Sequence, residues 1–282
     1  MEIRRAIGRD VAAAPRVWRR LVLLPCILIL PLLVPQKAFS QCTAENTAFR
    51  AGEELSYDLF FNWKFIWMNA GTASMRISQS SWEGKPAFRA SLITRTSERI
   101  DRFFMMRDTM VSIVTEDMAP RYFKKAANEG GRYYVDEVWY AYPDGQTHLR
   151  QRYRNRDGQV SEKTYDSPKC LYDMLSMMLR ARSFRADDFK KGQKLHPMMA
   201  DGHKVEDITL IYRGRETFKM KRTGIAYRCL VFSFVEYPEG KEKEIITFYI
   251  SDDDNHIPVR LDMFLRFGVA KAYLRESKGL RN

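Results

Sequence analysis

Apolar and polar residues alternate with a period of two along much of the chain. Residues 73–77, 88–92 and 259–265 are clear examples, because every second position in each run is apolar. In a β-strand this period turns one face toward a core and the other toward solvent. Aromatic and β-branched residues, which fit a pleated surface, are frequent in these runs. The pattern therefore predicts many strands, each with one buried face.

Short turn signals separate these runs. The most explicit are Glu83-Gly84, Pro143-Asp144-Gly145, Asp157-Gly158 and Pro238-Glu239-Gly240. Such residues adopt the backbone angles that tight turns need, and Asp-Gly pairs are typical of hairpin tips. Strands at short intervals, joined by tight turns, indicate an antiparallel meander.

One segment, residues 168–185, has the helical period instead. Its apolar stripe is formed by Leu171, Leu175, Met178 and Leu179. Ser167 suits an N-cap, with Pro168 in the first turn. Arginines near the end suit the helix dipole; they are Arg180, Arg182 and Arg185. We expect one principal helix here, packed on the concave side of a curved sheet, because its apolar stripe must be buried against another element. Leu175 and Leu179 are expected to face the sheet and to be nearly fully buried.

The expected fold is mainly β, with an antiparallel curved sheet, or a half-barrel or barrel-like meander, and one principal helix. Residues 41–282 are enough for one large or two small domains. The chain has no Pro/Ser/Gly-rich linker and no clear repeat. A single β-rich domain over residues 41–282 is therefore favoured.

The first 40 residues have the three-part layout of a secretory signal peptide. Six arginines precede the 14-residue apolar run 21–34, and Ala38 and Ser40 are the small residues of a cleavage site. A membrane anchor is the alternative, but a span needs about 20 apolar residues. Lipidation of Cys42 is disfavoured because Gln41, which precedes it, is not small. We expect cleavage after Ser40 and a periplasmic domain; association with the outer membrane is also consistent with the sequence.

Removing residues 1–40 lowers the positive charge of the chain. The whole chain has 47 Lys and Arg and 35 Asp and Glu, of which residues 1–40 hold 7 and 2. The remaining chain therefore has 40 basic and 33 acidic residues, which is a net charge of +7. The densest cluster is Arg150, Arg152, Arg154 and Arg156, which would share one face of an extended segment. This cluster indicates a solvated sheet face, or contact with anionic lipid or glycan. The expected compartment argues against nucleic acid as a partner.

No motif for catalysis, cofactor binding or metal binding is present. The chain lacks a Gly-x-Ser-x-Gly elbow, a phosphate loop and a dinucleotide fingerprint. His196 and His203, with Asp201 between them, lack the tight spacing of metal ligands. The acidic run 252–255 lacks the alternating ligands of a calcium loop, and we interpret it as a turn whose side chains bond nearby amides. A non-catalytic protein without cofactor or metal is favoured, although a triad from distant positions stays open.

Two dense aromatic stretches are the candidate ligand-binding residues. They lie at residues 60–67 and 103–106, and the side chains selected are Trp63, Trp67, Phe103 and Phe104. Core filling is the plainer interpretation. A ligand pocket or a surface that meets lipid is the functional one, because aromatic and Met side chains offer large, adaptable apolar area.

Three cysteines remain once the signal segment is removed, namely Cys42, Cys170 and Cys229. Cys229 lies within an apolar strand, where a small buried residue is explanation enough. Cys42 and Cys170 precede regular structure, where the chain can adjust to bridge geometry. A Cys42–Cys170 disulfide is therefore favoured in an oxidising compartment, with a Cys170–Cys229 bridge or no bridge as alternatives.

Three short motifs, in order, resemble the domain-of-unknown-function 3108 family of exported Gram-negative proteins. The first comprises residues 52–57 (GEELSY) and 69–73 (NAGTA), and the second comprises residues 170–173 (CLYD) with Arg180. The third comprises residues 251–259 (SDDDNHIPV) and 267–270 (FGVA). The resemblance covers roughly residues 42–282. It implies a secreted, β-rich fold and no established activity, so no functional residue is carried over from it.

Three classes of function follow from these features. The first is a non-catalytic binding or carrier protein for an apolar or amphipathic envelope ligand such as a lipid, with glycan or peripheral membrane contact as related options. The second is a protein that assembles or maintains the envelope through a protein partner. The third is a cell-wall or lipid hydrolase. A connected apolar cavity favours the carrier, a solid core with an exposed apolar patch favours a surface interaction, and a cleft with convergent carboxylates favours the enzyme.

Overall fold

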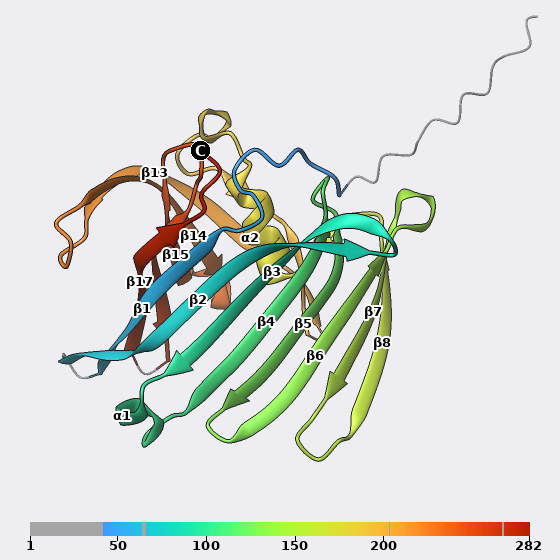
Figure 1. The fold of residues 1–282 in the computed structure, drawn as a ribbon, viewed down its shortest axis with the longest axis horizontal. Helices are drawn as coiled ribbons and strands as arrows, with labels where there is room; N and C mark the ends of the chain where they lie inside the picture. Colours follow the sequence, from blue (N-terminus) through green and yellow to red (C-terminus); the bar gives the residue numbers. More distant parts are fainter. Residues whose placement is uncertain (1–41, 64–65, 203, 267) are drawn as a thin grey trace, which may run out of the picture. The chain divides into compact units, whose positions relative to one another are not determined.

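A single large antiparallel sheet dominates the computed structural model, which describes residues 42–282 except 64, 65, 203 and 267. Its fourteen strands lie in the order β10-β13-β14-β15-β16-β17-β1-β2-β3-β4-β5-β6-β7-β8. The sheet is curved and does not close into a barrel, so β10 and β8 are its two edges (Figure 1). The prediction of a mainly β protein with a curved antiparallel sheet is confirmed. The predicted signal peptide, residues 1–40, lies outside the described residues and stays a prediction.

The first half of the large sheet is a meander in chain order. Its strands are β1 (Glu54–Trp63), β2 (Ile66–Trp82), β3 (Lys85–Thr96), β4 (Met106–Thr115), β5 (Pro120–Glu129), β6 (Arg132–Ala141), β7 (Thr147–Arg154) and β8 (Val160–Ser167). A four-residue helix, α1 (Glu98–Asp101), lies between β3 and β4. The Asp-Gly pairs predicted as hairpin tips do lie in turns, at β6–β7 and β7–β8.

The second half of the sheet is formed by the C-terminal part of the chain. Its strands are β10 (Lys194–Leu195), β13 (Thr209–Lys219), β14 (Ala226–Glu236), β15 (Lys243–Ser251), β16 (Pro258–Leu265) and β17 (Gly268–Lys278). β17 pairs with β1, so the two ends of the folded chain meet in the middle of the sheet. The alternating runs at 73–77, 88–92 and 259–265 lie within β2, β3 and β16, as predicted.

The principal helix, α2 (Met174–Arg182), starts six residues later than the sequence analysis expected. Ser167 ends β8, and Leu171–Tyr172 forms the short strand β9, which pairs in parallel with β11 (Met198–Asp201). β11 also pairs with β12 (Lys204–Asp207) to form a second, three-stranded sheet. The N-cap is Asp173, whose carboxylate accepts hydrogen bonds from the Leu175 and Ser176 amides. The expectation of a Ser167 cap with Pro168 in the first turn was therefore wrong.

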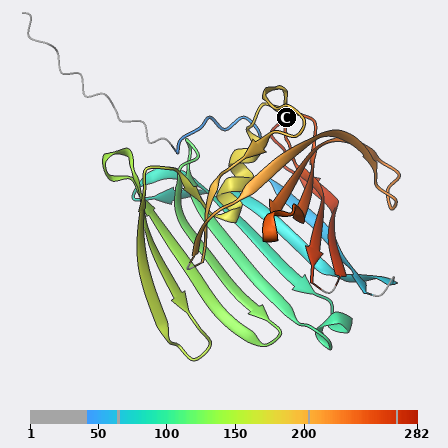
Figure 2. The ribbon, with the colours of Figure 1, turned by 180° about the vertical axis from the view of Figure 1, so that it is seen from behind.

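Helix α2 packs against β3 and β4 on the concave side of the sheet (Figure 2). Leu175 and Leu179 are 1% and 0% exposed, which confirms the predicted burial. The two leucines belong to a continuous core with residues of β1, β2, β4 and β6. No helix in the described part of the chain is both long and apolar enough to cross a membrane.

Replacing Leu179 by alanine is expected to lower the free energy of unfolding by about 2–5 kcal/mol, because the lost contacts leave a cavity beneath the helix. Urea unfolding followed by circular dichroism measures this change. Met174→Ala, on the exposed side of the same helix, is the matched control and is expected to change stability by less than about 0.5 kcal/mol. Equal losses for the two variants would contradict the packing described above.

Candidate functional site

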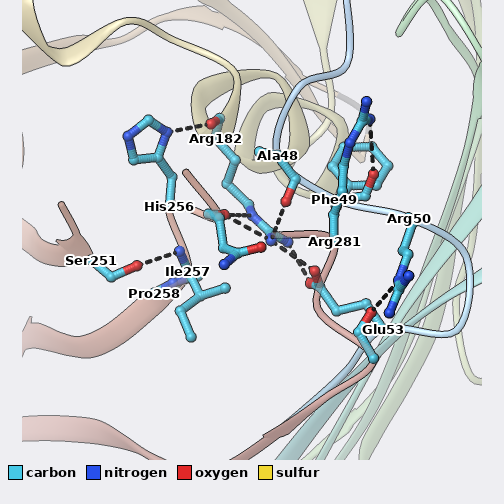
Figure 3. Close-up of polar contacts among 12 residues, drawn as sticks. Ala48, Phe49, Arg50, Glu53, Arg182, Ser251, His256, Ile257, Pro258 and Arg281 are labelled. Atoms are coloured by element: carbon cyan, nitrogen blue, oxygen red, sulfur yellow. Dashed lines mark hydrogen bonds and ion pairs between the residues drawn. The ribbon is translucent and has the colours of Figure 1, made fainter. Parts of the chain in front are cut away.

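A buried ion pair joins the C-terminal turn of α2 to the residue before β1. The Arg182 guanidinium donates to both carboxylate oxygens of Glu53, at 2.5 and 2.8 Å. Arg182 is 1% exposed and Glu53 is 0% exposed. Figure 3 shows the arginine extending from the helix end toward the glutamate. Because neither charge reaches solvent, each depends on the other for its stabilisation.

Backbone carbonyls complete the surroundings of this pair (Figure 3). Arg182 also donates to the carbonyl oxygens of Asn255 and Ala48. The His256 Nδ1 lies 2.6 Å from the Arg182 carbonyl oxygen, so this ring nitrogen carries the proton that it donates. We call Ala48, Glu53, Arg182, Asn255 and His256 the buried clasp. It joins the N-terminal segment, the helix end and the turn before β16.

The clasp brings together residues from parts of the chain that the sequence analysis treated as separate motifs. Glu53 comes from the first motif, Asn255 and His256 come from the third, and Arg182 lies on the helix that follows the second. Ala48, Glu53, Arg182 and Asn255 are buried, whereas His256 is half-buried and lines the larger surface hollow described below. The hydrogen bonds among these residues hold the fold together, and the Glu53–Arg182 ion pair presents no open face to a substrate. The predicted turn at 252–255 is confirmed, because the Asp253 carboxylate accepts from the amides of Asn255 and His256.

A disulfide between Cys42 and Cys170 lies beside the N-terminus of α2. It is the pairing that the sequence analysis favoured, and the Cα atoms are 5.2 Å apart. Cys229 is a buried free thiol within β14, as expected, and burial raises its pKa to about 11. The bridge and the clasp together fix residues 42–53 against the helix.

The predicted ligand-binding aromatics gather at one end of the large sheet. In an antiparallel meander, alternate turns lie at the same end, and the turns β16–β17, β1–β2, β3–β4 and β5–β6 follow one another along this end (Figure 1). Their exposed large apolar side chains, with exposed fractions of 37–74%, are Ile66, Trp67, Phe103, Phe104, Tyr133, Phe264 and Leu265. We call these seven residues the turn rim. Trp63 ends β1 at the same end, and its side chain lies outside the described residues.

Phe103 and Phe104 are held outward by a hydrogen-bonded turn. Their amides both donate to the Ile100 carbonyl oxygen. Asp101 accepts hydrogen bonds from Thr96 and Arg107, and these bonds hold the pKa of its carboxyl below its usual range. A side chain on Gly130 would come within 3.0 Å of the Phe104 ring, so the turns β3–β4 and β5–β6 touch. The phenylalanines therefore project from an ordered structure that reaches across two turns.

The rim carries more positive than negative charge. Arg99, Arg102, Arg132 and Arg266 are exposed in its turns, against the exposed Glu98. The Lys271 ammonium lies 5.2 Å from the centre of the Trp67 ring. At the opposite end, the turns carry the exposed acidic residues Glu83, Glu116, Asp117, Asp144, Asp253 and Asp254, together with the exposed Lys85. The two outer turns at the end that holds the rim, β7–β8 and β14–β15, carry charges of both signs, among them Asp157, Glu239 and Glu242. The excess of positive charge therefore belongs to the four turns of the rim itself.

The other features selected from the sequence have structural explanations. Of the predicted arginine cluster, Arg150, Arg152 and Arg154 share one face of β7, whereas Arg156 lies in the turn that follows the strand. Arg150 covers the Trp139 ring at 4.1 Å, and Arg152 lies 3.8 Å from Glu162. Within the described residues no group of three or more His, Cys, Asp or Glu is arranged to hold a metal. His203 and the side chain of Asp201 lie outside that part of the chain.

Two hollows, of about 620 and 720 Å³, lie at other places on the surface, and both are open to solvent. The larger is lined mainly by polar side chains, among them Arg215, Arg228 and Asp252. Two ion pairs already join these three, because both arginines bond the Asp252 carboxylate. Neither hollow is an enclosed apolar cavity of the kind that a lipid carrier requires.

Asp108, the acidic residue of β4, has its carboxyl buried on the concave face. Burial raises the pKa of Asp108 to about 6, the neighbouring Glu129 adds to the rise, and Lys125 opposes it. Burial likewise raises the pKa of the cap residue Asp173 to about 6. Because these folded-state values exceed the unfolded ones, the folded protein binds more protons between about pH 4 and pH 6. Its stability therefore falls as pH rises through this window.

Asp108→Asn is expected to reduce the loss of stability between pH 4 and pH 7 by on the order of 2 kcal/mol, because the neutral amide does not ionise. Urea unfolding at a series of pH values measures this difference. Asp144→Asn, in an exposed turn at the other end of the sheet, is expected to leave the pH profile unchanged. An unaltered profile in the Asp108 variant would show that this carboxyl does not titrate in the window.

Fold and sites together define a β-rich protein built on an open, curved antiparallel sheet. The family described as "Protein of unknown function (DUF3108)" matches residues 56–275, and the chain belongs to this family. The fold is similar to a crystal structure of a β-barrel-like protein of domain of unknown function DUF1849 from Brucella abortus. The TM-score is 0.53 and the identity 12%, over 82% of this chain and 99% of that chain, so the similarity concerns the fold alone. No curated protein matches the sequence.

Proposed function

We propose that this chain is a non-catalytic protein of the cell envelope that binds the surface of an anionic lipid bilayer through its turn rim. The observation that carries the proposal is the exposure of seven large apolar side chains at one end of the sheet. Apolar groups gathered in this way on a folded protein mark a surface that another molecule covers. The amphipathic ligand expected from the sequence is then a lipid met at the bilayer surface.

The chemistry of the rim favours a bilayer over a protein partner. Trp67, Phe103 and Phe104 are suited to the headgroup and acyl boundary, where aromatic rings insert between lipids. The exposed arginines lie where the phosphates of such a bilayer would be, and each basic residue near an anionic surface contributes roughly 1 kcal/mol. The acidic residues of the β2–β3, β4–β5 and β6–β7 turns lie at the far end, away from the anionic surface. The apolar side chains and arginines of the rim therefore favour an orientation in which these three turns point away from the membrane.

The concave face supports surface binding over a carrier function. The helix and the sheet share a continuous core that includes Leu175, Leu179 and residues of β1 to β6. A lipid carrier would need part of that space for acyl chains. Binding through the rim requires no such space, and the periplasmic side of either envelope membrane offers a suitable surface. This location remains part of the proposal.

Phe103→Ser combined with Phe104→Ser is expected to weaken binding to vesicles of neutral and anionic phospholipid by at least about tenfold, because two rings no longer enter the bilayer. Co-sedimentation of the chain beginning at Gln41, the processed form expected from the sequence, measures the partition coefficient. Binding of the unaltered chain is also expected to fall at high salt, because salt screens the arginines.

The matched control is Tyr165→Ser combined with Ile225→Ser. These residues are 39% and 50% exposed and lie outside the rim. The control is expected to bind vesicles like the unaltered chain. If the rim variant keeps full binding, or if the control loses as much, the rim is not the membrane-binding surface.

A further inference from the structure

The edge strand β8 is open along its whole length, and this feature is independent of the turn rim. β8 is the last strand of the large sheet, and every residue from Val160 to Asp166 is exposed (Figure 1). It pairs with β7 over eight residues without a register shift. Within the described residues, no backbone hydrogen bond joins its outer side to another segment. The opposite edge, β10, has only two residues.

Such an edge presents a regular row of backbone donors and acceptors. On the outer side of an edge strand, alternate residues direct their N–H and C=O groups away from the sheet, where an extended segment can pair with them. Proteins commonly protect such edges with proline, a bulge, a very short strand or charged side chains. Between Val160 and Ser167, β8 has no proline and no bulge, and its protection consists of the exposed charges Glu162, Lys163 and Asp166. These charges disfavour most strands but favour a segment of complementary charge.

The side chains of β8 form two rows of different charge. Lys163 and Tyr165 pair with the buried residues Gln151 and Leu149 of β7, so they belong to the concave face. Glu162, Thr164 and Asp166 alternate with them and belong to the convex face. The convex row is therefore acidic at two positions, and the concave row carries one lysine and one tyrosine. On the β7 side, Glu162 lies 3.8 Å from Arg152 and Asp166 lies 2.5 Å from His148, and both carboxylates remain exposed on the outer side.

A second copy of this chain does not fit the edge well. Antiparallel pairing of β8 with itself about a two-fold axis keeps each residue on its own face. Two registers of this kind pair seven residues of each copy. In the first, Lys163 lies opposite Lys163 of the other copy. In the second, Glu162 of each copy lies opposite Asp166 of the other. Like charges directly opposite each other destabilise a strand pair.

We propose that β8 binds an extended segment of a partner protein by antiparallel strand addition. The two rows specify the side chains of that segment. Basic residues fit opposite Glu162 and Asp166, an acidic residue fits opposite Lys163, and an apolar or aromatic residue fits beside Tyr165. Read in its own direction, the segment has the pattern basic, apolar, Thr or Val, acidic, basic. Main-chain hydrogen bonds supply the affinity and these side chains supply the specificity.

Two synthetic peptides test the proposal. The matched peptide carries Lys-Phe-Thr-Glu-Lys between flanking valines. The charge-reversed peptide carries Glu-Phe-Thr-Lys-Glu between the same valines, so each charged residue has the opposite sign. The matched peptide is expected to bind at least about tenfold more tightly, because three cross-strand charge pairs are attractive with it and repulsive with the other peptide. Amide hydrogen exchange is expected to slow in residues 160–167 when it binds.

The control is the variant Glu162→Lys, Lys163→Glu, Asp166→Lys, whose altered side chains are all exposed. It is expected to reverse the preference between the two peptides. Because the new lysines face Arg152 and His148 of β7, a small loss of stability is expected, and binding is compared under conditions in which urea unfolding shows both proteins to be folded. Equal binding of both peptides, no binding, or protection outside β8 would overturn the proposal. Protection of residues 160–167 that rises with protein concentration alone would also overturn it, because a second copy would then be the partner.

Discussion

Replacing Arg182 by methionine is expected to destabilise the protein by about 3–5 kcal/mol, because it leaves the Glu53 carboxylate buried without its cation. Methionine retains much of the side-chain volume, so the effect arises mainly from charge and hydrogen bonding. The Asn255 and Ala48 carbonyls also lose the donors that Arg182 supplies. Urea unfolding of the two proteins at pH 7 measures the difference.

The double variant Glu53→Met, Arg182→Met shows how much of the lost stability comes from leaving the Glu53 charge unpaired. Removing both charges is expected to cost less than removing Arg182 alone, because no unpaired buried charge remains. Arg180→Met is the matched control on the same helix. Arg180 is half-buried, donates to the Cys42 and Thr43 carbonyls and lies 5.4 Å from the centre of the Tyr172 ring. Its loss leaves no buried charge unpaired and is expected to cost about 1 kcal/mol. If the Arg182 and Arg180 variants are equally stable, the clasp does not hold the fold together.

The disulfide is expected to stabilise the protein by roughly 4–5 kcal/mol in the chain-entropy model, because Cys42 and Cys170 are 128 residues apart. Cys42→Ser combined with Cys170→Ser is expected to lower the unfolding midpoint in urea, and dithiothreitol is expected to lower it for the unaltered chain. The reductant should have no further effect on the double variant, because its remaining thiol, Cys229, is already free.

Peptide mapping without reduction provides an independent test of the same bond. Cys42 and Cys170 are expected to appear in one cross-linked peptide, and Cys229 is expected to react with an alkylating reagent only after unfolding, since it is buried. Alkylation of Cys42 before any reduction would show that the bridge is absent from the protein.

The alternation of apolar and polar residues was enough to predict most of the large sheet. Runs such as 88–92 became strands because one face of each is covered by the core. The start of the helix was mispredicted, since Ser167-Pro168 resembles a cap while Asp173 forms a capping box with Ser176. Local sequence does not show that residues 171–172 pair with β11, and this tertiary contact keeps them extended.

The buried clasp was missed because arginine near a helix end has a simpler explanation in the helix dipole. A signal was nevertheless present: Arg182 follows Leu175 by seven residues and Leu179 by three, so it continues the apolar stripe. A charged residue on a buried stripe needs a buried partner. The identity of that partner, Glu53, depends on the folded chain and could not be predicted from spacing.

The turn rim was predicted only in part. The aromatic stretches were selected, but core filling and surface exposure were both consistent with their composition. Whether these side chains form an exposed surface depends on which turns lie together at one end of the sheet. The order of the strands in the sheet decides this. Ile66 and Trp67 begin β2, and Phe103 and Phe104 lie in the turn before β4. All four are exposed, because the helix covers the middle of the sheet and not this end.

The most direct test of the central claim is an environment-sensitive fluorophore placed at each end of the sheet. Phe103→Cys and Asp144→Cys supply the two labelling sites, because the native Cys229 is buried and the other two cysteines are bonded. When anionic phospholipid vesicles are added, the label at 103 is expected to brighten and shift to shorter wavelength as it enters the bilayer, while the label at 144 stays unchanged. No change at 103, or the same change at both positions, would contradict membrane binding through the turn rim.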